Sequence, residues 1–215
     1  MFTGFPEQAL DFYEGLEADN SRTYWQANKD VYESAVRAPM LALLADLEPE
    51  FGPGRIFRPN RDVRFAADKS PYKTHCGAVL ADHAGQAGGY VEISAAGLVV
   101  AGGYYSTEPD QVERYRRAVA DDVQGRRLVR TVAALREGGY ELGGTVLKTS
   151  PRGYPKDHPR ADLLRHRTLY ARCGWKPEPW LHTAAAADRV RAAWRAFAPL
   201  NAWLAEQVGP AGLLP

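Results

Sequence analysis

The chain has 215 residues, of which 45% are hydrophobic and 25% are charged, and its formal net charge at pH 7 is +1. This is the balance of an ordinary globular protein, and a chain of this length buries enough apolar surface to need neither disulfides nor a structural metal. The mean hydropathy of −0.40, with no apolar run near the ~20 residues of a membrane helix, predicts a soluble protein without a membrane partner.

The first quarter of the chain is predicted to be helical. Pro6 suits the first turn of a helix, and Asn20 or Ser21 can cap the next one. The apolar residues that recur at helical spacing are Leu10, Tyr13, Leu16, Trp25, Tyr32 and Val36. Pro39 should kink or restart the second helix, and residues 48–55, which hold two prolines and two glycines, are predicted to form a loop.

The middle of the chain changes to β-structure. Runs of alternating or β-branched residues predict strands at residues 62–65, 74–81, 90–94 and 98–105. Ala96–Gly97 is expected to form the hairpin turn between the last two strands.

Helices return after residue 105. Thr107, with Asp110 three residues later, resembles a capping box, and Pro109 suits an early helical position. Two apolar stripes follow, formed by Val112, Tyr115 and Val119 and then by Leu128, Val132 and Leu135. The remaining elements are predicted as short strands at 140–142, 145–148 and 168–172, a loop at 150–159, a short helix at 161–165 and a last long helix that Pro199 interrupts.

The order of these elements indicates the fold class. Helices come first, then a cluster of strands, then helices, which favours an α+β fold with a largely antiparallel sheet over a βαβ repeat. No linker or repeat divides the sequence, so we expect a single domain over residues 1–215, with helices from the N-terminal, central and C-terminal segments packed on the sheet.

Several mechanisms lack their motifs in this sequence. There is no P-loop, no Rossmann glycine fingerprint, no nucleophile elbow and no Cys/His spacing typical of zinc. Asp82–His83 and Asp157–His158 are acid–histidine neighbours, but adjacent residues on a strand point to opposite faces. We therefore expect both pairs in loops or on the surface, and we expect no cofactor and no metal.

The cysteines and the N-terminus predict the compartment. Only Cys76 and Cys173 occur, which is too few for a disulfide framework. The first ten residues lack the basic and apolar regions of a signal peptide. We expect a cytoplasmic protein in a reducing environment, without a disulfide.

The first of two notable polar segments is Arg61–Lys73. Asp62 and Arg64 lie two residues apart, should share one face of a strand and can form an ion pair. Asp68 can accept a hydrogen bond from the backbone at Ser70 in an Asx-turn. One interpretation of this segment is a stiff turn with a structural ion pair, and the other is a recognition site.

Three further side chains project from the same turn. Lys69, Tyr72 and Lys73 follow Asp68 closely, around Pro71, which favours an extended backbone before it. No local contact is predicted for the two lysines, so we expect them to present charge to solvent or to a ligand.

The second polar segment is Leu147–Pro159. Glycine and proline restrict this loop and reduce the entropy that it would lose on binding. Its hydrogen-bond donors are Lys148, Arg152, Tyr154 and His158. The alternative is a proline-stiffened surface loop whose Asp157 caps the following helix.

Charge is distributed unevenly between these regions and the rest of the chain. Residues 55–73 and 148–176 together hold 14 basic and 4 acidic residues, which leaves 13 basic and 22 acidic residues elsewhere. If the two regions meet in space, they form a positive cleft that attracts anions, and arginine suits phosphate or carboxylate. The residues predicted to bind a ligand are Arg61, Asp62, Arg64, Asp68, Lys69, Tyr72, Lys73, Tyr104, Lys148, Arg152, Tyr154 and His158.

Tyr104 enters this set because it ends a strand together with Tyr105, just after Gly102–Gly103. One tyrosine of the pair should point away from the core, where its ring can stack on a ligand. The alternative is one core tyrosine and one surface tyrosine without a binding role.

Four strings of residues carry a family resemblance. They are Asn20 with Trp25 and Asn28–Tyr32, then Arg61–Lys73, Gly102–Tyr105 and Lys148–Pro159. On these strings, the chain from about Phe5 to Leu204 resembles the family called domain of unknown function 2461, a widespread family of conserved hypothetical proteins. Ala67 stands where that family leads us to expect serine, and Arg167 where lysine is commoner. The resemblance implies an α+β fold and brings no established catalytic residue.

Three functions stay open at this point. The first is binding of a small anionic ligand, phosphorylated or carboxylated, by a binding protein or by an enzyme that uses Asp62, Asp68, Tyr72 or His158 as acid or base. The second is a nucleic-acid-binding module, for which a pI near 7.8 is low. The third is a module that binds an acidic protein. A deep pocket favours the first function, a flat basic face the second and an exposed apolar patch the third.

Overall fold

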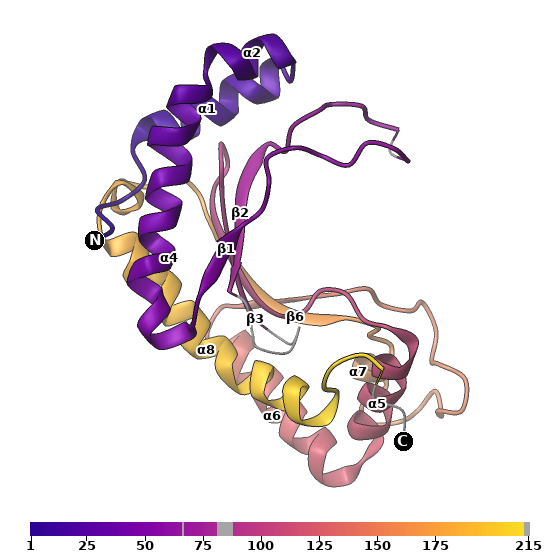
Figure 1. Ribbon diagram of the computed structural model, residues 1–215. Helices are drawn as coiled ribbons and strands as arrows, with labels where there is room; N and C mark the ends of the chain where they lie inside the picture. Colours follow the sequence, from indigo (N-terminus) through magenta and orange to yellow (C-terminus); the bar gives the residue numbers. More distant parts are fainter. Residues whose placement is uncertain (66, 81–87, 213–215) are drawn as a thin grey trace. The chain divides into compact units, whose positions relative to one another are not determined.

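The computed structural model describes residues 1–65, 67–80 and 88–212. Figure 1 shows the chain as a ribbon, and its contacts group into two compact units. Unit 1 comprises Met1–Ala81, Tyr90–Val100 and Gly174–Ala192, and unit 2 comprises Asp82–Gly89, Ala101–Cys173 and Ala193–Pro215. The expected single domain over residues 1–215 stays a prediction.

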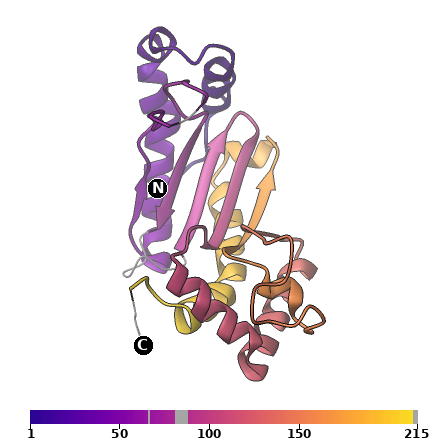
Figure 2. The same ribbon diagram turned by 90° about the vertical axis from the view of Figure 1, so that its right-hand side faces the viewer.

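The described strands form one six-stranded sheet in the order β1-β2-β3-β4-β6-β5. Figure 2 shows the central strands of this sheet side by side. The strands are β1 (Gly54–Ile56), β2 (His75–Leu80), β3 (Gly88–Ser94), β4 (Gly97–Tyr104), β5 (Glu141–Gly143) and β6 (Leu169–Trp175). The pairs β1–β2, β2–β3 and β5–β6 are antiparallel. The expected α+β class with an antiparallel sheet is therefore confirmed.

The N-terminal helices belong to unit 1. They are α1 (Glu7–Ala18), α2 (Arg22–Ala27), α3 (Lys29–Val31), the π-helical turn η1 (Tyr32–Arg37) and α4 (Ala38–Phe51). Ser21 caps α2, because its hydroxyl accepts a hydrogen bond from the amide of Tyr24 at 3.1 Å. Pro39 lies in the first turn of α4, but Arg37 and Ala38 both keep right-handed helical backbone angles, so the chain passes from η1 into α4 and does not restart at the proline.

Two predictions in unit 1 are wrong. The loop expected from residue 48 is helical up to Phe51, with Pro49 inside α4. Pro49 removes the one hydrogen bond that its own position would donate within the helix, and the buried Leu43 and Leu47 hold the helix on the core in spite of this loss. Residues 62–65 form no strand, because no described strand pairs with their backbone, and the Val63 carbonyl oxygen accepts the Lys69 ammonium group instead.

The sheet in unit 1 has two different faces. A side chain at Gly54 would meet Leu44 of α4 at 2.8 Å, so α4 covers the face that carries Gly54. Ala78 and Val91 share this face and are fully buried, as the register requires. Figure 1 shows α1 and α4 on one side of β1 and β2.

The hairpin turn between β3 and β4 is formed by Ala95–Ala96, one residue before the expected position. Gly97 has a φ of +108°, and a side chain there would meet the carbonyl oxygen of Trp175 at 2.1 Å. The glycine is thus required by a close backbone approach, which sequence spacing does not reveal.

Unit 2 contains α5 (Pro109–Ala120), α6 (Asp122–Glu137) and α7 (Ala161–Leu164). The capping box of α5 is formed by Glu108 and Gln111, so the expected Thr107–Asp110 box is wrong. Thr107 instead donates its hydroxyl to the carbonyl oxygen of Arg167 at 2.7 Å. This bond fixes the loop before β6 beside the start of α5.

Two further expectations in the second half of the chain are corrected. Residues 145–148 form only an isolated bridge, between Val146 and His166, and no strand. The helix α8 (Ala185–Gln207) continues through Pro199, and the short 3₁₀-helix η2 (Pro179–His182) precedes it. The buried Leu200 and Trp203 hold the part of α8 that follows the proline. In the ranges that the structure describes, no helix is long and apolar enough to cross a membrane.

Candidate ligand-binding regions

The first basic segment forms an arm, defined here as residues 57–74, which continues the β1–β2 ladder in unit 1 (Figure 1). The amide of Arg61 donates to the carbonyl oxygen of Pro71 at 2.9 Å, and the amide of Lys73 donates to that of Pro59 at 2.8 Å. Backbone pairing therefore fixes the base of the arm.

Opposite charges pair within the arm. Arg64 donates two hydrogen bonds to the Asp62 carboxylate, at 2.9 and 2.7 Å, as the ion-pair interpretation expects. Asp68 accepts the amide of Ser70 at 2.9 Å, which is the predicted Asx-turn, and also pairs with Arg61. The hydrogen bond from Arg61, then those from Ser70, hold the pKa of Asp68 well below its usual range.

The two lysines of the arm do make local contacts, contrary to expectation. Lys69 Nζ donates to the carbonyl oxygen of Val63 at 2.9 Å, and Lys73 Nζ donates to that of Arg58 at 3.0 Å. Burial and then the charge of Arg58 lower the pKa of Lys73. A long flexible side chain reaches carbonyls that sequence spacing alone does not identify.

Tyr72 anchors the arm to the N-terminal helices. It is 8% exposed, and its ring stacks on Trp25 with centroids 4.3 Å apart. The Asn20 side chain donates to the Tyr72 carbonyl oxygen at 3.0 Å and accepts its amide at 3.1 Å. The structure thus gives Tyr72 a packing role.

The second basic segment lies in unit 2. Lys148 and Arg152 are exposed and Tyr154 is half-buried. His158 Nδ1 accepts the amide of Arg160 at 3.0 Å, so the histidine, rather than the expected Asp157, makes the hydrogen bond before α7. Whether this segment meets the arm of unit 1 stays a prediction.

Arg160, also in this segment, has a structural role. Its side chain is 8% exposed and donates to the carbonyl oxygens of Val119 and Ala120, at 2.7 and 2.8 Å. It also pairs with Asp122 at 3.1 Å. The guanidinium therefore donates to the last carbonyl oxygens of α5, and its charge is paired within the protein and is not available to a ligand.

A pocket of about 310 Å³ lies between α5 and the loops around the second basic segment. It is lined by Pro109, Val112, Arg116, Leu147 and Arg167. Three of these side chains are apolar and two are guanidinium groups, so the pocket combines an apolar floor with two fork-shaped donors. Among the described residues, Arg116 donates one internal hydrogen bond, from Nε to the carbonyl oxygen of Leu164 at 3.3 Å.

The two arginines of this pocket influence each other. Burial lowers the pKa of Arg116, the nearby Tyr154 opposes this shift and Arg167 adds to it. In the part of the chain that the structure describes, no carboxylate pairs with Arg116 or Arg167. Sequence reasoning missed Arg116, because it lies on α5, outside both basic segments, and no local motif marks it.

A larger and more open groove, of about 620 Å³, lies along α5 and the start of α6. Its lining includes Arg114, which is engaged with the chain after α8. The lining of the groove also includes Arg117 and the carboxylate of Asp121, whereas no carboxylate lines the smaller pocket.

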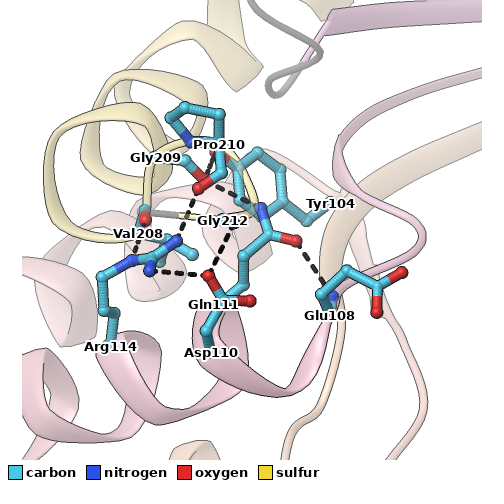
Figure 3. Close-up of polar contacts among 9 residues, drawn as sticks. All are labelled: Tyr104, Glu108, Asp110, Gln111, Arg114, Val208, Gly209, Pro210 and Gly212. Carbon is cyan, nitrogen blue, oxygen red and sulfur yellow. Dashed lines mark hydrogen bonds and ion pairs between the residues drawn. The ribbon is translucent and has the colours of Figure 1, made fainter. Parts of the chain in front are cut away.

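Tyr104 is one of the side chains that hold the segment after α8, residues 208–212, by hydrogen bonds to its main chain (Figure 3). Its ring is 5% exposed, and its hydroxyl donates to the carbonyl oxygen of Gly209 at 3.2 Å, beside the Gln111 amide at 2.8 Å. Arg114 donates to the Pro210 carbonyl oxygen at 2.6 Å. Tyr105 is the exposed member of the tyrosine pair. The structure therefore places Tyr104 among packing residues.

The candidate residues thus fall into three groups. Arg61, Asp62, Arg64 and Asp68 neutralise one another within the arm. Tyr72 and Tyr104 are buried. The remaining candidates carry donors at the surface or near the pocket, namely Lys69, Lys73, Lys148, Arg152, Tyr154 and His158. His83 lies outside the described residues.

Comparison with known proteins gives one match. The family model described as Conserved hypothetical protein (DUF2461) matches residues 8–203. No curated protein and no solved structure matches the chain.

Proposed function

The chain belongs to the DUF2461 family, whose description names no activity. From the geometry of the pocket lined by Arg116 and Arg167, we propose that the protein binds a small anionic ligand there, phosphorylated or carboxylated. The supporting observation is that two guanidinium groups from separate elements line one pocket while no described carboxylate pairs with either.

The electrostatics of the pocket favour an anion. Partial burial destabilises the charged form of Arg116, and the charge of Arg167 adds to this effect. An anion between the two groups relieves both effects and accepts fork-shaped hydrogen bonds. A volume of about 310 Å³ is at the lower end for ligand pockets, which suits a small metabolite with an apolar part above Val112 and Leu147.

The proposal is for binding and includes no chemical step. Arginine stays protonated and does not exchange protons at neutral pH, and the other lining residues of the pocket are apolar. Lys148 follows the lining residue Leu147 in sequence, and Tyr154 acts electrostatically on Arg116. We propose that these two side chains extend the site, and that Arg152 of the same segment adds to its positive potential.

Titration of wild-type protein with inorganic phosphate and with benzoate, by calorimetry, tests the proposal. Arg116→Gln and Arg167→Gln should each weaken binding of the better ligand by about tenfold or more, because each removes a charge-assisted hydrogen bond. Arg130→Gln, on the exposed part of α6, is the matched control and should bind as wild type does. Equal affinity in all four proteins would show that the pocket is not the anion site.

We also propose a cytoplasmic location, which rests on cysteine usage. Cys76 is a buried thiol, and burial raises its pKa to about 12, so it stays protonated and unreactive at neutral pH. Such a cysteine suits a reducing compartment. Cell fractionation followed by immunodetection checks this proposal, and recovery from an extracytoplasmic fraction would contradict it.

A further inference from the structure

The face of the unit 1 sheet that α4 does not cover carries a connected row of polar and aromatic side chains. In the register of β2 and β3, Gly77 lies opposite Glu92, and Val79 lies opposite Tyr90. The amide of Phe57 donates to the carbonyl oxygen of Gly77 at 2.9 Å, which continues β1 along the same ladder. Because alternate residues share a face, the side chains of Phe57, Tyr90 and Glu92 lie on this second face.

Tyr90 lies over Gly77. A side-chain carbon at Gly77 would stand 2.6 Å from the Tyr90 hydroxyl oxygen and 3.1 Å from its Cε2, so the ring occupies the space that a larger residue would need. The Tyr90 hydroxyl donates to Glu92, which fixes the ring. A half-buried ring held in this way presents an aromatic surface on the sheet.

One end of this row accepts hydrogen bonds. Glu92 Oε2 receives the Tyr90 hydroxyl and lies 3.8 Å from His75 Nε2. The carboxylate keeps acceptor sites beyond the bond from Tyr90, because an ionised carboxylate offers about four. A ligand with an amino group or a ring N–H can use them.

The other end of the row is cationic. The Phe57 ring lies 6.4 Å from the Tyr90 ring, and its centre is 5.1 Å from Arg55 Cζ and 5.2 Å from Lys73 Nζ. In the described residues of unit 1, neither cation pairs with a carboxylate within salt-bridge distance. Lys73 is partly desolvated beside Arg58, as its lowered pKa reflects, and an anion would offset both effects.

We propose that this face of unit 1 binds a nucleoside phosphate, with the base on Tyr90 and Phe57, a base amino group on Glu92 and the phosphate on Lys73 and Arg55. The three features of the row match the three parts of such a ligand, namely a planar ring, a hydrogen-bond donor and an anion. The site uses none of the residues of the Arg116–Arg167 pocket, so it goes beyond the function proposed above.

The test is calorimetric titration of the Arg167→Gln protein, which lacks one arginine of the other pocket, with adenosine 5′-monophosphate. Adenosine and inorganic phosphate are titrated separately, since each carries only part of the proposed recognition. The monophosphate should bind at least about tenfold more tightly than either part, because it joins the charge-assisted bonds of the phosphate to the stacking of the base.

Four variants, of which Lys69→Gln is the control, locate the site. Lys73→Gln should weaken binding of the monophosphate by about tenfold or more, while Lys69→Gln, which removes the same charge elsewhere on the arm, should leave it unchanged. Phe57→Leu should weaken it by about fivefold or more through lost stacking. Glu92→Gln should reduce the preference for adenosine monophosphate over purine riboside monophosphate, whose base has neither an amino group nor a ring N–H to donate to Glu92.

The proposal is overturned if the monophosphate binds no better than phosphate, or if Lys73→Gln and Lys69→Gln have equal effects. It is also overturned if only a single-stranded oligonucleotide of about 15 thymidines binds, with the steep salt dependence of a phosphate-tracking surface. Loss of phosphate binding in Arg116→Gln with unchanged monophosphate binding supports both sites independently.

Discussion

The arm of unit 1 and the pocket of unit 2 both contain arginines, but they differ in whether carboxylates neutralise the arginine charge. In the arm, Asp62 and Asp68 lie within seven residues of the arginines that they neutralise. In the pocket, Arg116 comes from α5 and Arg167 from the loop before β6, and no described carboxylate accompanies them. A high density of basic residues along the sequence therefore does not measure the charge that is available to a ligand.

The largest expected effect concerns the anchor of the arm, and it tests whether the arm depends on packing rather than on its charges. Tyr72→Ala should lower the free energy of unfolding by about 3 kcal/mol, because it removes a buried ring stacked on Trp25. Tyr72→Phe keeps that ring and should cost less than about 1 kcal/mol. Urea denaturation of both variants provides the measurement, and equal losses would contradict the packing role.

The second prediction concerns the buried arginine of unit 2. Arg160→Gln should destabilise the protein by about 2 kcal/mol, because the carbonyl oxygens of Val119 and Ala120 lose their donors inside the structure. Arg152→Gln, an exposed arginine of the same segment, should change stability by less than about 0.5 kcal/mol. If the two variants unfold at the same urea concentration, the distinction between structural and available arginines in unit 2 does not hold.

The third prediction concerns pH and the charge pairing in the arm. The pKa of Asp68 is lowered in the folded protein, so its contribution to stability is fully present above the unfolded pKa of about 3.9 and is lost as pH falls through the folded value. Arg61→Gln should raise the pKa of Asp68 by removing its main partner. Carboxyl-carbon NMR titration measures both values, and an unchanged titration of Asp68 would contradict the pairing.

The smallest effect is expected at Lys69. Its ammonium group donates to the Val63 carbonyl oxygen on an exposed part of the arm, where water can replace it. Lys69→Ala should therefore leave the free energy of unfolding within about 0.5 kcal/mol of wild type. A loss above 1 kcal/mol in a urea melt would show that this contact, unlike a typical surface contact, organises the arm.

Local patterns in the sequence predicted much of the fold. Helical spacing identified the stripe of Leu10, Tyr13 and Leu16, and all three residues are buried in α1. The Asx-turn of Asp68 was predictable because it depends on residues two apart. Pro49 and Pro199 were misread, because packing of a helix on the core can outweigh the local preference of proline.

The candidate site was less predictable, because its determinants are distant in sequence. Arg116 and Arg167 are 51 positions apart, and hydrogen bonds such as that from Thr107 to the Arg167 carbonyl oxygen, together with the packing of α5, bring them to one pocket. The ring of Tyr90 is placed by an absent side chain at Gly77 on a neighbouring strand. Neither relation leaves a local signature in the amino-acid sequence.

The hydrogen bonds that hold the segment after α8 determine which substitutions and which fusions the protein tolerates there. Arg114, Gln111 and Asp110 contact main-chain atoms of residues 208–212 rather than their side chains (Figure 3). Because these contacts depend on the backbone and not on the side chains of residues 208–212, most substitutions there should be tolerated if Gly209 and Gly212 keep their positive φ. Linkers and tags are therefore better joined beyond residue 212 than inserted before it, where they would leave the amide of Gln111 buried without its acceptor.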